Sequence, residues 1–202
     1  MTPVARRHCK WTRKKSAVFR NNNLYAQELS KLILKGNNKM TLGELYLKEL
    51  EAEAGPTRKC LEKISENLFG WKPHEKSMQM GYLAMIVAEI PLWIYHMAVG
   101  SEIDFVRFDH FQPTNAAELA KHFDDNMEKA RKALQSISDE AMEEPFSLKA
   151  NGQLIFTSPR KENIAPSINH MVHHRGQLTV YMRLNNLPVP AIYGPSADEG
   201  GF

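Results

Sequence analysis

The chain has 202 residues, of which 43% are hydrophobic and 24% are charged. A chain of this length and composition can bury a sizeable core without covalent cross-links. It contains only two cysteines, which excludes a small secreted domain held together by disulfides. The longest apolar stretch, residues 82–99, is interrupted by Glu89, Pro91 and His96. We therefore expect no membrane span and a cytoplasmic protein.

Positive charge is concentrated in residues 1–39, which carry ten of the 26 Lys and Arg residues and a single acid, Glu28. This leaves 16 bases and 22 acids for residues 40–202. We predict that Met40 is the true start and that residues 1–39 are an over-extended reading of the gene or a disordered extension. The alternative is a basic anchor or a transit segment. Nucleic-acid binding would depend on this segment alone, and we do not expect it.

Two helices are predicted in the first half of the body. Residues 41–67 repeat apolar side chains at helical spacing, and Thr41 with Glu44 forms the pattern of a capping box. Ser77 is expected to cap the second helix, which extends to about residue 99. This helix is apolar on more than one face, so we expect it to be deeply buried.

The second half of the body combines helices with a short β segment. A third helix is expected after Thr114, over about residues 115–137, and a fourth over about 160–184. Between them, residues 143–158 break the helical pattern, and the Asn151-Gly152 pair suits a type I′ turn. The sequence therefore predicts an all-α fold in residues 40–202: a four-helix up-down bundle with a small β-hairpin before the last helix.

Two histidines of the last predicted helix are candidate metal ligands. His170 and His174 are four residues apart and share one helix face. Two imidazoles so placed can hold one divalent metal ion, and a third ligand must then come from another helix. The same spacing also occurs in many helices that bind nothing, so spacing alone favours the structural interpretation.

Four segments resemble the DinB-like family. Residues 169–183, Asn-His-Met-Val-His-His-Arg-Gly-Gln-Leu-Thr-Val-Tyr-Met-Arg, look like the signature of its last helix, and residues 71–77, 83–91 and 189–195 are also similar to members. The resemblance implies a four-helix bundle, often a homodimer, with a three-histidine site for a divalent metal such as nickel or zinc. Relatives include thiol transferases that use low-molecular-weight thiols.

The resemblance maps the family's last-helix pair onto His170 and His174. The remaining family histidine lies in the pattern Leu-Ala-x-His-Val-Ala-Glu, and this chain has Ile86 at that position. Isoleucine cannot bind a metal, so the site is predicted to be degenerate. Glu89, one turn further along the helix, and His74, in the preceding loop, are the candidate replacement ligands.

The sequence also suggests a substrate pocket that contains His74, Arg175 and Gln177. Our leading interpretation is a DinB-like protein with a degenerate metal site and a cleft for a small-molecule ligand between the second and fourth helices. One alternative is an active metal-dependent transferase or hydrolase that uses a replacement third ligand. The other is a non-enzymatic helical module with a basic, nucleic-acid-binding arm.

Overall fold

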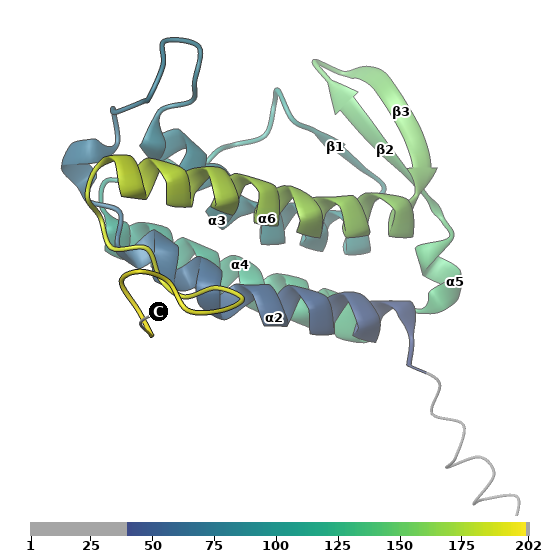
Figure 1. The fold of residues 1–202 in the computed structure, drawn as a ribbon. Coiled ribbons are helices and arrows are strands. Elements are labelled where there is room, and N and C mark those ends of the chain that lie inside the picture. Colours follow the sequence, from purple (N-terminus) through teal and green to yellow (C-terminus); the bar gives the residue numbers. More distant parts are fainter. Residues whose placement is uncertain (1–39, 201–202) are drawn as a thin grey trace, which may run out of the picture. The chain divides into compact units, whose positions relative to one another are not determined.

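The computed structural model describes residues 40–200, and the predictions about residues 1–39 lie outside this part of the chain. Four long helices form a bundle (Figure 1). Their bounds are α2 (Leu42–Glu62), α3 (Met80–Val99), α4 (Ala116–Ser136) and α6 (Arg160–Leu184). Shorter elements are η1 (Glu66–Leu68), α5 (Asp139–Met142) and the strands β1 (Glu102–Asp104), β2 (Pro145–Ala150) and β3 (Gln153–Pro159). The predicted helical bundle with a hairpin before the last helix is confirmed.

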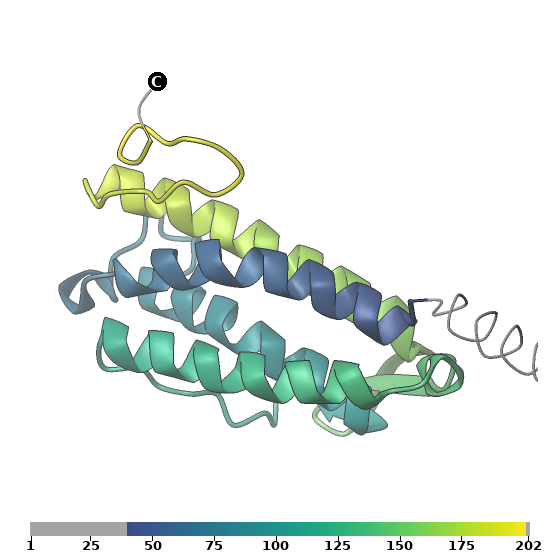
Figure 2. The ribbon, with the colours of Figure 1, turned by 90° about the horizontal axis from the view of Figure 1, so that it is seen from below.

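The directions of the helices differ from strict up-down alternation. The Arg160 side chain, at the start of α6, donates to the Met97 carbonyl near the end of α3, so these two helices are antiparallel. The Tyr46 hydroxyl near the start of α2 donates to the Lys161 carbonyl, so α2 and α6 run in the same direction. Figures 1 and 2 show that α3 and α4 are also parallel. The connection of residues 100–115 allows this, because it is long enough to return along the bundle.

The first turns of α2 and α3 show which of the predicted helix caps are present. The capping box at α2 is present: Thr41 accepts from the Glu44 N–H, and the Glu44 carboxylate accepts from the Thr41 N–H. The predicted cap at Ser77 is wrong, because α3 begins at Met80 after Gln79 without a side-chain cap. The Met80 N–H instead donates to the Trp71 carbonyl, so the preceding loop satisfies the start of α3.

Helix α3 is the core helix of the bundle, as predicted. It packs against α4 on one side and α6 on the other, and most of its residues are buried. By length and composition alone it could cross a membrane, but 72% of its most apolar window is buried inside the described fold. Its hydrophobicity is therefore explained by its position in the core.

A three-stranded sheet lies beside the start of α6 (Figure 1). The predicted Asn-Gly turn is confirmed, because Asn151 has φ 51° and Gly152 has φ 80°, the left-handed region that a type I′ turn needs. Strand β1, which was not predicted, pairs in parallel with β2. The Asp104 carboxylate accepts from the N–H groups of Asn151 and Gly152 at 3.0 and 2.6 Å. These bonds fix the hairpin to the connection that follows α3.

Candidate functional site

The two predicted metal-ligand histidines lie side by side on α6. The ring centroids of His170 and His174 are 4.4 Å apart, which agrees with one turn of helical spacing. His174 is buried, whereas His170 reaches solvent. The ring of His170 also lies 5.8 Å from the indole of Trp93 on α3. The pair therefore occupies the groove side of α6 that faces α3.

Neighbouring side chains contact both imidazoles. Nδ1 of His174 lies 2.7 Å from Oε1 of Gln177. Because an amide oxygen only accepts, Nδ1 donates to it, which leaves Nε2 as the nitrogen that faces away from Gln177. Partial burial lowers the pKa of His170 below its ordinary value, and the neighbouring His174 and His173 lower it further. The ring of His170 thus favours the neutral form, which is the form that binds metals.

The third position of the family pattern does not offer a ligand. Ile86 is packed in the hydrophobic core at 8% exposure. Among residues 40–200, no group of three His, Cys, Asp or Glu side chains is arranged to hold a metal ion. The donor set therefore does not fit the three-histidine centre that the resemblance implies.

Glu89, the first candidate replacement, is engaged elsewhere. Its fully buried carboxylate accepts from the Phe111 N–H at 2.7 Å and from Nδ1 of His110 at 2.7 Å. Both partners belong to the connection between α3 and α4. The carboxylate thus fastens this connection to the core helix.

His74, the second candidate, is exposed in the loop before α3, and its Nδ1 accepts from the Lys76 N–H at 3.1 Å. Arg175, which we placed at the substrate pocket, is 1% exposed and lies against α2 instead. It forms an ion pair of 2.6 Å with Glu53 and donates to the Tyr193 hydroxyl at 2.8 Å. The structure therefore brings together only His170, His174 and Gln177 among the predicted site residues.

A cavity of about 450 Å³ opens beside His170. It is enclosed by the end of α3, the first half of α6 and the hairpin. The lining is mainly apolar and aromatic, and it includes Trp93, Met97, Phe105, Phe146, Leu148, Phe156, Glu162, Asn163, Pro166, Ser167 and His170. The lining residues from the connection after α3 and from the hairpin were not predicted. The signal that could have indicated them is the cluster of aromatic residues in these two non-helical segments.

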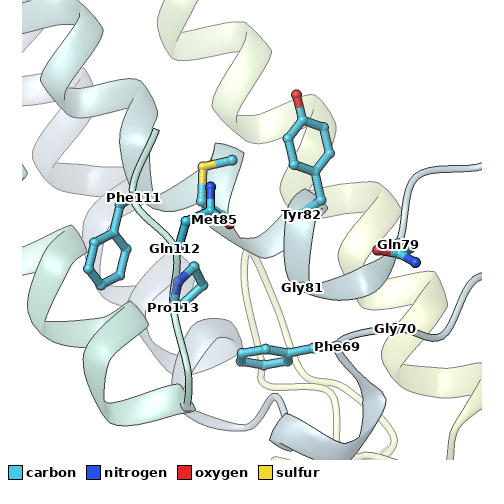
Figure 3. Close-up of a pocket in the computed structure, with 9 residues that line it drawn as sticks. All are labelled: Phe69, Gly70, Gln79, Gly81, Tyr82, Met85, Phe111, Gln112 and Pro113. Atoms are coloured by element: carbon cyan, nitrogen blue, oxygen red, sulfur yellow. The ribbon is translucent and has the colours of Figure 1, made fainter. Parts of the chain in front are cut away.

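A second, smaller cavity of about 280 Å³ lies at the other end of α3. Figure 3 shows its lining, which comes from the loop before α3, the first turns of α3 and the connection to α4. The Gly81 backbone closes against Phe69, because an added Cβ would come within 2.8 Å of that side chain. This cavity contains none of the predicted site residues.

Comparison with known proteins gives consistent matches. The model of the DinB family matches residues 36–200. The chain is 28% identical over 158 residues to YrdA, an uncharacterized protein of Bacillus subtilis. The aligned region covers 76% of this chain and 89% of YrdA.

Two solved structures have a similar fold. A DinB-like protein from Bacillus cereus has a TM-score of 0.58 and 24% identity, over 76% of this chain and 99% of its own. YjoA, a DinB-like protein of Bacillus subtilis, has a TM-score of 0.56 and 20% identity, over 77% and 99%. At these identities the two structures establish the fold alone.

Proposed function

The chain belongs to the DinB family, and from this premise we propose that it binds a small molecule in the cavity beside His170. We further propose that its divalent-metal site is degenerate, with His170 and His174 as the two remaining ligands. We assign this cavity, which is lined by α3, α6 and the hairpin, as the ligand cleft.

The observation that carries the ligand proposal is the cavity itself. Its volume of about 450 Å³ lies in the range of small-molecule sites, about 300–1,000 Å³. Such sites combine an apolar lining with a few polar groups that orient the ligand. Here the aromatic side chains supply the apolar lining, and His170 with Glu162 and Asn163 supplies the polar groups.

The metal proposal rests on the donor set. Two imidazoles at one helix face can hold nickel or zinc weakly, whereas structural and catalytic zinc sites in proteins use at least three protein ligands. Ile86 supplies no donor, and the Glu89 carboxylate is already engaged by His110 and Phe111. We therefore expect a metal ion, if added, to exchange readily.

The ligand proposal is tested with a cavity-filling variant of the full chain. N-phenyl-1-naphthylamine, a neutral apolar fluorophore, should bind the wild type and gain fluorescence. Leu148→Trp fills the cavity from β2 and should weaken this binding at least tenfold. Leu154→Trp is the matched control, because Leu154 is 60% exposed on the same hairpin and does not line the cavity. Equal binding by all three proteins would contradict the proposal.

The metal proposal is tested by elemental analysis after native purification without an affinity tag. Wild type and His170→Ala should both contain far less than one equivalent of nickel or zinc. A near-stoichiometric metal that is lost in His170→Ala would overturn the degenerate site. It would favour a metal-dependent transferase or hydrolase with a third ligand from elsewhere in the chain.

A further inference from the structure

The cavity beside His170 has an acidic mouth. Its lining contains one carboxylate, that of Glu162, and no lysine or arginine. Glu162 is exposed and makes no ion pair with any of residues 40–200. The cations that precede it in the chain are already paired, since Lys161 contacts Glu143 and Arg160 contacts Glu144. Glu162 lies in the first turn of α6, where Lys161 is a nearby charge but no side chain of residues 40–200 forms an ion pair with it.

The interior of the cavity also favours positive charge near an apolar body. Trp93 and Phe105 meet edge to face with ring centroids 4.9 Å apart, and Phe146 and Phe156 line the cavity from the hairpin. Aromatic rings carry negative potential on their faces and attract cations there. A ligand with a flat apolar body and a cationic end would satisfy both parts of the cavity.

We propose that this cavity takes an arylalkylamine, with its aromatic ring among Trp93, Phe105 and Phe146 and its protonated alkyl nitrogen at the carboxylate of Glu162. The proposal rests on the proposed function, because it names the chemical class of ligand for the same cavity. The nitrogen donates to the carboxylate, and no covalent step is involved.

The test uses three probes that share one indole ring and differ only in their end group: tryptamine, tryptophol and indole-3-acetate. Their dissociation constants are measured by calorimetry on the full chain at neutral pH. We expect tryptamine to bind about threefold to fivefold more tightly than tryptophol, the effect of a partly exposed ion pair. Indole-3-acetate should bind most weakly.

Glu162→Gln should abolish the advantage of tryptamine over tryptophol and leave the affinity for tryptophol unchanged. Glu49→Gln is the control, because it removes one exposed carboxylate from α2, away from the cavity lining. Equal binding of the three probes by the wild type, or a tryptamine advantage that survives Glu162→Gln, would overturn the amine proposal.

The ligand-binding function and the preference for an amine can fail separately. If N-phenyl-1-naphthylamine binds but the indole probes show no preference for the amine, the cavity binds ligands of another class. If neither the fluorophore nor any indole probe binds, the proposed ligand-binding function fails together with the amine proposal.

Discussion

Nδ1 of His174 donates to Oε1 of Gln177 across one turn of α6, at 2.7 Å. Histidines that ligate metals commonly donate their other ring N–H to an oxygen in this way, which fixes the tautomer and the ring orientation. Gln177, which we had expected at a substrate pocket, thus positions His174. The last helix thus has the arrangement that the proposed site with two histidine ligands requires.

Restoring the missing ligand should restore tight binding. Ile86→His places an imidazole on α3, two helical turns before Trp93 and on the same face of the helix. We expect the variant to purify with close to one equivalent of nickel or zinc. We also expect a loss of stability of about 1–3 kcal/mol without metal, because a polar ring replaces a buried apolar side chain. A metal content equal to that of the wild type would show that this position no longer faces the pair.

The positioning role of Gln177 can be measured in the same background. Gln177→Leu added to Ile86→His should weaken metal binding about 10- to 100-fold, the usual effect of removing such a partner. Gln153→Leu is the matched control, because Gln153 is exposed on β3. Competition with a chromophoric chelator gives both affinities. An unchanged affinity in the Gln177→Leu variant would limit this glutamine to a structural role.

Arg175 is predicted to matter for stability. Its buried guanidinium holds Glu53 at 2.6 Å, Thr57 at 3.0 Å and Tyr193 at 2.8 Å. Arg175→Met leaves the Glu53 carboxylate without its cationic partner, although the Tyr193 hydroxyl still donates to it, so we expect a loss of about 3 kcal/mol in the free energy of unfolding. Arg183→Met breaks only the exposed ion pair with Asp198 and should cost less than about 1 kcal/mol. Urea unfolding compares the two, and equal losses would contradict the prediction.

A homodimer is expected through the outer face of α6. Val180 and Leu184 are one turn apart on this helix and are 57% and 58% exposed. Contiguous exposed apolar surface marks contacts between proteins, and we expect this pair to lie at the centre of such a contact. We expect light scattering to give a dimer for the wild type and a monomer for the double variant Val180→Glu with Leu184→Glu. A wild type that is monomeric at micromolar concentration would exclude this interface.

The elements that were predicted well are those fixed by local chemistry. The bounds of α6 agree with the sequence prediction, residues 160–184. The capping box of α2 and the Asn-Gly turn are also present, because each depends on residues at most three positions apart. Strand β1 was missed because it is three residues long and pairs with β2, more than 40 positions away.

Site residues were predicted less well, because neighbours on a helix face different partners. His174 and Arg175 are adjacent in sequence, and the helix rotates by about 100° between them. One therefore faces the groove toward α3, while the other reaches Glu53 on α2. Glu89 shows the same effect, since it lies close to Ile86 in sequence but contacts His110 from the long connection. Only the packing of the helices decides between such faces.

The stability of the fold should fall between about pH 7 and pH 5 because of two partly buried histidines, His122 and His96. Burial lowers the pKa of His122, against an opposing effect of Glu89, and it also lowers the pKa of His96. Nε2 of His122 is buried without a partner in the described residues, and its ring stacks on Phe111 at 4.2 Å. The other charged groups that act on His122 are Lys129, Asp125 and Lys121.

The sign of the effect follows from proton binding. A histidine whose pKa is lowered by folding binds its proton more readily in the unfolded chain, where the pKa of histidine is about 6.5. Its unfavourable effect is therefore absent above that value and grows as the pH falls toward the folded pKa. His122→Gln should reduce the loss of unfolding free energy between pH 7.5 and pH 5.5, measured with urea. His74→Gln, at an exposed position, should leave the loss unchanged. If His122→Gln and the wild type lose equal stability over this interval, the ring of His122 is protonated in the folded chain as easily as in the unfolded one.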